Sequence, residues 1–176
     1  MSWMIGLTRK IEGLAARTEM AYKLIAGYYR DMIQKEINLA KIKKDDHILC
    51  IGGGVCPFSA ILFQQSTGAK VTVIDNNKDC TSKASKIIKR LGLENNMQVL
   101  HQDGNTPSIH FSNYTIVHIA QQVHPIESVF TNIQSQIKPG TKLLIRRPKH
   151  SPPPNHIPQT KHKITKNVGS TLLYIK

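Results

Sequence analysis

The stretch that decides the fold is residues 48–57, which read Ile48-Leu49-Cys50-Ile51-Gly52-Gly53-Gly54-Val55-Cys56-Pro57. Its first four residues extend an apolar run from His47, which is typical of a strand buried on both faces of a parallel sheet. The three glycines that follow allow a sharp turn and the close approach of a ligand, because they carry no Cβ. Pro57 suits the first turn of a helix. The stretch therefore predicts a strand, a ligand-binding loop and a helix, in that order.

The alternation of strands and helices continues along the chain. Helices are expected at 57–66, 79–91 and 127–137, and strands at 47–51, 71–75, 97–101, 114–120, 142–146 and 170–175. Strands that alternate with helical segments of this length indicate βαβ units. We therefore predict an α/β fold: a Rossmann-like, doubly wound, mostly parallel sheet with an N-terminal helical extension. A ligand would bind at the carboxyl ends of the strands.

We expect one domain, residues 1–176, built from three segments. Residues 1–40 have the apolar spacing of helices, with Gly13 and Gly27 as candidate points of division. Residues 41–147 form the cofactor-binding core. Residues 148–176 are predicted to form an extended Pro-rich loop and a closing strand.

The net charge of +13 is unusual for a chain of 176 residues. A surface of this kind attracts polyanions, so a nucleic acid or an anionic surface is a candidate partner, with a solvated basic surface as the alternative. The Pro/His-rich tail adds cations that could contact an RNA backbone, among them Arg146 and Arg147. The chain has no apolar run long enough for a transmembrane segment and no signal-peptide pattern, which predicts a cytoplasmic location. We predict no metal site, because the spaced tail histidines match no standard zinc pattern.

The candidate ligand site combines the glycine loop with an acid. Asp75 closes the second expected strand, 23 residues after Gly52. A carboxylate at that place can bind both hydroxyls of a ribose. The helix after the loop offers free N–H groups to an anionic group of the ligand. Together these features predict a nucleoside held near Gly52, Gly54 and Asp75.

The loop also narrows the choice of nucleoside. A dinucleotide site needs G-x-G-x-x-G, but Pro57 stands where the third glycine belongs. The P-loop pattern G-x-x-x-x-G-K-[S/T] is absent. S-adenosylmethionine carries no phosphate, so the loss of the third glycine affects its binding least. The alternative is a glycine-rich turn without a ligand.

The order of these segments resembles the class I S-adenosylmethionine-dependent methyltransferases. The resemblance covers about residues 40–147 and rests on five segments: 48–57, 71–75, 99–103, 114–125 and Lys138-Pro139-Gly140. It implies that Gly52 and Gly54 line the methionine end, that Asp75 binds the ribose and that Asp103 faces the adenine amino group. It places Ala120 and Gln121 beside the sulfonium. The expected cofactor site comprises Gly52, Gly53, Gly54, Pro57, Asp75, Asn76, Asp103, Gly104, Ala120 and Gln121.

The chain departs from that family at two positions. Cys50 stands where the family often has an acid, and Cys56-Pro57 replaces the third loop glycine. In this form the loop is similar to the nicotianamine synthase-like branch, which uses the same cofactor but transfers an aminobutanoyl group.

Three functions follow as hypotheses. The first is an S-adenosylmethionine-dependent methyltransferase that acts on an unidentified small-molecule nucleophile, with His124 as a proton acceptor and Gln121 as an orienting residue. The second is aminobutanoyl transfer from the same cofactor. The third is a non-catalytic basic protein that binds RNA or a membrane on a methyltransferase-like fold. The sequence determines neither the acceptor nor the oligomeric state.

Overall fold

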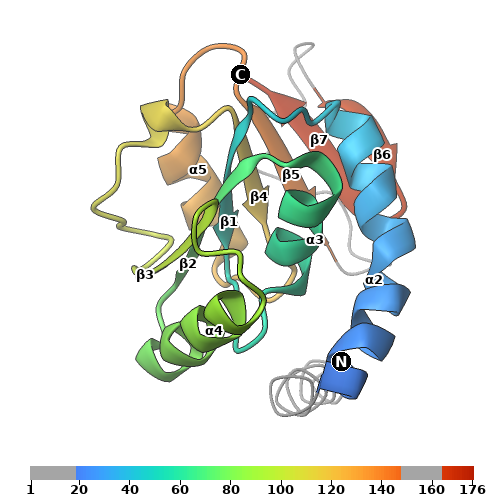
Figure 1. The fold of residues 1–176 in the computed structure, drawn as a ribbon. Coiled ribbons are helices and arrows are strands. Elements are labelled where there is room, and N and C mark those ends of the chain that lie inside the picture. Colours follow the sequence, from blue (N-terminus) through green and yellow to red (C-terminus); the bar gives the residue numbers. More distant parts are fainter. Residues whose placement is uncertain (1–18, 148–163) are drawn as a thin grey trace.

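A seven-stranded sheet with helices on both faces forms the centre of the molecule (Figure 1). The computed structural model describes residues 19–147 and 164–176. The strand order is β3-β2-β1-β4-β5-β7-β6. The strands are β1 (His47–Ile51), β2 (Lys70–Asp75), β3 (Met97–His101), β4 (Ile116–Ile119), β5 (Lys142–Arg146), β6 (Ile164–Val168) and β7 (Thr171–Ile175). The first five pair in parallel, whereas β7 is antiparallel to both β5 and β6. The predicted Rossmann-like α/β class is confirmed.

The described chain has four α-helices and one short 3-10 helix. They are α2 (Glu19–Ala40), α3 (Phe58–Thr67), α4 (Lys78–Arg90) and α5 (Ile126–Gln136), with the 3-10 helix η1 at Phe111–Asn113. α3 ends at Gly68, whose positive φ of 73° directs its amide back to the carbonyl of Gln64. α4 begins at Asn77, whose side chain accepts hydrogen bonds from the amides of Asp79 and Cys80.

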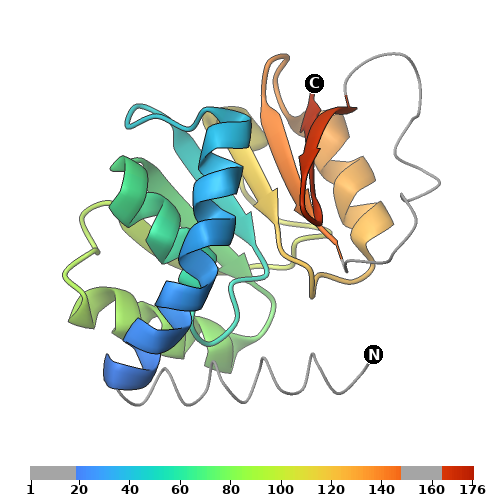
Figure 2. The same ribbon diagram turned by 90° about the vertical axis from the view of Figure 1, so that its right-hand side faces the viewer.

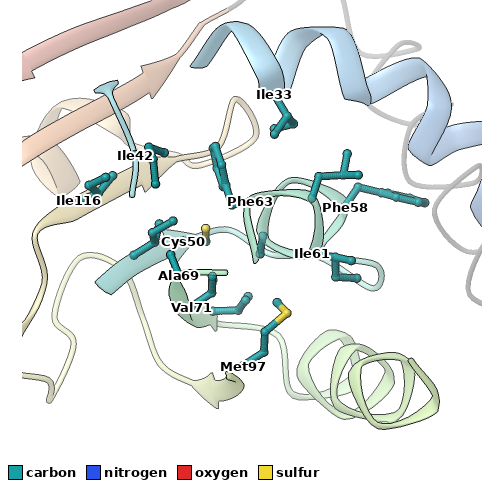
Figure 3. Packing of buried hydrophobic residues seen from close by; sticks show 14 of the residues in the cluster. Ile33, Ile42, Cys50, Phe58, Ile61, Phe63, Ala69, Val71, Met97 and Ile116 are labelled. Carbon is teal, nitrogen blue, oxygen red and sulfur yellow. The ribbon is translucent and has the colours of Figure 1, made fainter. Parts of the chain in front are cut away.

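The two faces of the sheet bury separate apolar clusters. One face packs against α2, α3 and α4, and the other packs against α5. Figure 2 shows this layering, with α5 on the far side of the sheet from α2. In Figure 3, Ile33 extends from α2 toward α3, while Ile61 and Met97 lie on the side of α4. Such burial is the main source of helix stability, because isolated helices are marginal in water.

Two expectations for the ends of the chain need correction. Gly27 does not divide the N-terminal helix, since α2 runs without a break from Glu19 to Ala40. A glycine costs a helix only about 1 kcal/mol relative to alanine, which packing against α3 and the sheet outweighs. The sequence also predicted only one strand after the tail, but β6 precedes β7 and forms a hairpin with it. The two-residue Gly169-Ser170 turn between two short strands was an available signal for this hairpin.

Other expectations concern residues that the structure does not describe. The possible break at Gly13 and the extended loop over 148–163 lie outside the described residues. Within the described ranges, no helix is long and apolar enough to cross a membrane. The predicted extent of the domain, 1–176, stays a prediction.

The order of the strands places a crevice between β1 and β4. Successive connections leave β1 toward β2 on one side, whereas β4 and β5 lie on the other. In doubly wound sheets this reversal opens a crevice at the carboxyl ends of the two central strands, where ligands bind. Gly52 follows β1 and Ala120 follows β4, so the glycine loop lies at the crevice.

Candidate active site

The glycine loop turns sharply as it leaves β1. Gly52 and Gly54 have φ angles of 82° and 63°, which favour glycine over residues with a Cβ. At Gly53 the constraint is space, because a Cβ there would lie 2.2 Å from Cγ1 of Val73 on β2. The amides of Gly52 and Gly53 donate to the carbonyl of Ile74, at 2.9 and 3.4 Å. The loop is therefore held against β2, the strand that carries the predicted acid.

Asp75 meets the loop directly. Its Oδ2 accepts a hydrogen bond of 2.8 Å from the amide of Gly54, and its Oδ1 accepts one of 2.9 Å from the amide of Asn77. The side chain is half-buried at the carboxyl end of β2. The structure thus brings together the turn after β1 and the carboxylate after β2, as the sequence predicted.

The remaining residues of the predicted nucleoside site lie at the same edge of the sheet. Asn76 follows Asp75, and its carbonyl is 3.0 Å from Nε2 of His101. Asp103 and Gly104 come shortly after β3, which pairs with β2 in register. Asp103 is exposed, and its Oδ1 accepts from the amide of Asn105 at 2.8 Å. Two of the strands that carry predicted site residues are thus neighbours at the edge where a ligand would bind.

Small residues line the predicted path of the cofactor. A Cβ added at Gly52 would lie 2.7 Å from Cγ2 of Val123 and 3.4 Å from Cβ of Ala120. A Cβ at Gly104 would lie 2.6 Å from Cγ2 of Ile51. These glycines let the walls of the crevice pack closely, and the half-buried carboxylate at the end of β2 can accept hydrogen bonds from ribose hydroxyls. The residues present therefore fit the adenosine part of S-adenosylmethionine.

The turn after β4 contacts the glycine loop through Gln122. Its Nε2 donates to the carbonyl of Gly52 at 3.0 Å, which links the turn to the loop. Gln121, the residue predicted to be functional, is half-buried beside it. His124 is exposed and precedes α5. The roles of Gln121 and His124 stay predictions, and the contact of Gln122 with the loop is one that the sequence did not predict.

A buried polar cluster lies on the α2 and α3 side of the sheet, and the sequence analysis missed it as well. Glu36 of α2 is 1% exposed and forms a bidentate ion pair with Arg146 of β5. Nε and Nη2 of Arg146 donate to the two carboxylate oxygens at 3.0 and 2.6 Å. Oγ1 of Thr171 donates to Oε1 of Glu36 at 2.6 Å, and Nη1 of Arg146 donates to Oγ of Ser59 at 2.9 Å. The prediction that Arg146 is a tail cation for RNA is therefore wrong, because burial and the ion pair occupy its guanidinium.

His118 of β4 completes the polar cluster. Its Nε2 lies 3.7 Å from Oε2 of Glu36, which is too far for a hydrogen bond, and has no partner in the described part of the chain. Burial lowers the pKa of His118 to about 4, with a further contribution from the positive charge of Arg146. Burial opposes the ionisation of Glu36, but the charged and hydrogen-bonding groups around it lower its pKa. Near neutral pH the cluster thus contains one anion, one cation and a neutral imidazole.

A cavity of about 50 Å³ separates this cluster from the glycine loop. On one side it is lined by Gly52, Gly53, Ala120 and Gln122, and on the other by Ser59, His118 and Arg146. Tyr29 of α2 and residues at the start of α3, including Pro57, enclose it. The cavity therefore shares Gly52, Gly53 and Ala120 with the predicted methionine end of the cofactor site. Among the residues that the structure describes, no group of three or more His, Cys, Asp or Glu could hold a metal ion.

Comparison with known proteins identifies the family. Residues 25–171 match the family model described as protein-L-isoaspartate(D-aspartate) O-methyltransferase (PCMT). The chain belongs to this methyltransferase family. Its family and fold are therefore those of the class I S-adenosylmethionine-dependent transferases, whose cofactor is S-adenosylmethionine.

Two curated relatives of this PCMT-family chain are L-histidine 2-aminobutanoyltransferases. The protein from Yersinia pestis is 28% identical over 41% of the chain and 27% of its own length. The protein from Pseudomonas aeruginosa is 28% identical over 68% of the chain and 45% of its own length. The chain thus spans less than half the length of either relative.

Solved structures show the same fold. A mutant of MtNAS in complex with S-adenosylmethionine has a TM-score of 0.81 at 18% identity, covering 99% of this chain and 75% of that one. A putative S-adenosylmethionine-dependent methyltransferase from Methanococcus maripaludis has a TM-score of 0.67 at 19% identity, covering 79% and 63% of the two chains. An RNA methyltransferase from Salinibacter ruber, in complex with S-adenosylhomocysteine, has a TM-score of 0.60 at 17% identity. The match covers 82% of this chain and 88% of that one.

Proposed function

We propose that this protein transfers the methyl group of S-adenosylmethionine to a small-molecule nucleophile. The observation that carries the proposal is the contact between the Gly54 amide and the Asp75 carboxylate, because it supports a site in which the loop and the acid bind one adenosine together. In this proposal Asp75 binds the ribose hydroxyls and Asp103 faces the adenine amino group. Gly52 and Gly54 line the methionine chain, beside Ala120 and Gln121.

Catalysis in this site would consist mainly of positioning. Bound S-adenosylmethionine supplies a sulfonium whose methyl group is already reactive, so alignment of the nucleophile provides much of the rate. Gln122 holds the turn after β4 against the glycine loop through the carbonyl of Gly52, and so orders the wall of the crevice next to Gln121. His124, exposed at the start of α5, would accept the proton that the nucleophile loses.

The decisive experiment combines binding with product analysis. Titration calorimetry should detect S-adenosylmethionine binding at micromolar to millimolar concentrations. Incubation with radiolabelled cofactor and fractions of small-molecule extracts should then release S-adenosylhomocysteine in step with acceptor labelling. The absence of binding up to millimolar concentration, together with tight and salt-sensitive RNA binding, would favour the non-catalytic hypothesis instead.

Aminobutanoyl transfer is the second candidate, and the relatives favour it. Both curated relatives named above are 2-aminobutanoyltransferases. The two candidates differ in their products, because aminobutanoyl transfer releases methylthioadenosine in place of S-adenosylhomocysteine. One chromatographic separation of the nucleoside products therefore chooses between them.

The remaining expectations concern location and partners. We propose a cytoplasmic location and a small acceptor, and we keep a nucleic acid or another anionic surface as a candidate partner on account of the +13 charge. Exclusion of Arg146 from solvent removes one cation from that partner surface.

A further inference from the structure

The cavity behind the glycine loop is richer in hydrogen-bond donors than its structural role requires. Arg146 has five N–H donors. One at Nε and one at Nη2 donate to Glu36, and one at Nη1 donates to Ser59. Since Ser59 accepts this hydrogen bond, its own hydroxyl proton is available to another acceptor. The cavity wall therefore offers N–H and O–H groups beyond those that the ion pair uses.

His118 adds a polar group that the fold leaves unsatisfied. It is 1% exposed, lines the cavity, and its Nε2 lacks a hydrogen-bond partner among the described residues. An unpaired buried polar atom costs about 1–3 kcal/mol, so native proteins seldom keep one without a water, an ion or a ligand nearby. A group that enters the cavity could satisfy the imidazole and the guanidinium together.

The size and position of the cavity restrict what this group can be. About 50 Å³ holds a few heavy atoms, which excludes a nucleoside. Gly52, Gly53 and Ala120 line the cavity and also belong to the predicted cofactor site, so the cavity borders the predicted methionine end. A carboxylate has the right size, accepts several hydrogen bonds and matches the geometry of a guanidinium edge.

We propose that the cavity is a carboxylate subsite in which Arg146, Ser59 and His118 bind the carboxylate of an α-amino acid group. Glu36 acts as a positioning residue, because its two oxygens fix the guanidinium plane. The proposal rests on the proposed function, since the carboxylate belongs to a molecule in the transferase site. Two sources supply this chemistry: the methionine part of the cofactor and an amino acid acceptor.

The experiment compares ligands that differ only by a carboxylate. Calorimetry would measure binding of S-adenosylmethionine and its decarboxylated form, and, with methylthioadenosine present, of L-histidine and histamine. L-histidine serves as the acceptor probe because the relatives are named for it. We expect at least a tenfold preference for the carboxylate in one of the two pairs. A preference in the first pair assigns the subsite to the cofactor, and a preference in the second assigns it to the acceptor.

Variants test whether the cavity residues produce this preference. Ser59→Ala should reduce it several-fold. The double variant Glu36→Gln with Arg146→Gln should abolish it, and it removes both charges together, so that neither is left buried alone. Thr171→Val is the matched control. Thr171 donates to Oε1 of Glu36, as Nε of Arg146 does, but it does not line the cavity. Its preference should equal that of the wild type, even if its melting temperature falls.

Each remaining outcome has a distinct meaning. Equal binding within both pairs, with S-adenosylmethionine still bound, would overturn the carboxylate subsite and leave the proposed function intact. A preference that persists in the double variant would overturn it as well. The absence of binding by any of the four ligands would remove the proposed function and this inference together.

Discussion

The amide of Gly54 lies 2.8 Å from Oδ2 of Asp75, although the two residues belong to different βα units. This hydrogen bond holds the turn after β1 against the end of β2. It leaves the carboxylate half-buried at the edge of the sheet, where a ribose can approach it. The backbone of the loop and the carboxylate of Asp75 thus form this part of the crevice together. A substitution at either place should therefore weaken the binding of the cofactor.

Removal of the Asp75 carboxylate should weaken cofactor binding. We expect Asp75→Ala to lower the affinity for S-adenosylmethionine at least tenfold, because a hydrogen bond to a charged group contributes about 1.5–3 kcal/mol. Calorimetric titration measures the change. Asp79→Asn is the control, since Asp79 is exposed and pairs with Lys83 on the surface of α4. Unchanged affinity in Asp75→Ala would contradict the ribose assignment.

Substitutions at Gly53 and Val73 should have non-additive effects on the free energy of unfolding, because the two residues pack tightly together. A Cβ in Gly53→Ala would collide with Val73, so we expect a loss of stability of about 1–3 kcal/mol. Val73→Ala removes the colliding atom but is itself destabilising, because Val73 is fully buried. Urea denaturation of both single variants and the double variant gives the coupling energy. Strictly additive effects would show that the collision does not determine the cost.

The buried ion pair should be much more important for stability than a surface pair. Glu36→Gln leaves Arg146 buried without a counter-charge, which typically costs about 3–5 kcal/mol. Asp31→Asn breaks an exposed pair with Lys35 on the same helix and should change stability by less than about 1 kcal/mol. Chemical denaturation compares the two variants. Equal effects would mean that the Glu36 site is open to water.

His118 should make the folded protein sensitive to acid. Its folded pKa, lowered to about 4 by burial, lies below the usual value of 6.5. The unfolded chain therefore binds the extra proton first, and stability is lost as pH falls from about 6.5 toward 4, by up to about 3 kcal/mol. Denaturation at several pH values should show a smaller loss in His118→Gln than in the wild type. An exposed control, His110→Gln, should keep the wild-type dependence.

The core of the fold could be predicted because its signals are local. The apolar runs that end at Ile51 and at Asp75 predicted their strands and order, and the glycines marked the turn between β1 and α3. The boundaries of β4 and α5 shifted by one or two residues, as the ends of such elements generally do. The uninterrupted helix through Gly27 was missed because tertiary packing overrides a weak local preference.

The sequence by itself determined the class of fold, the parallel core and the meeting of the glycine loop with Asp75, since these depend on spacing within short segments. Only the tertiary structure decided that Arg146 is buried against Glu36, 110 positions away, and that Arg146 lines a cavity together with His118. A charged residue in sequence is most often exposed. Its burial depends on which distant partner the completed sheet brings within hydrogen-bond distance, and no local pattern encodes that partner.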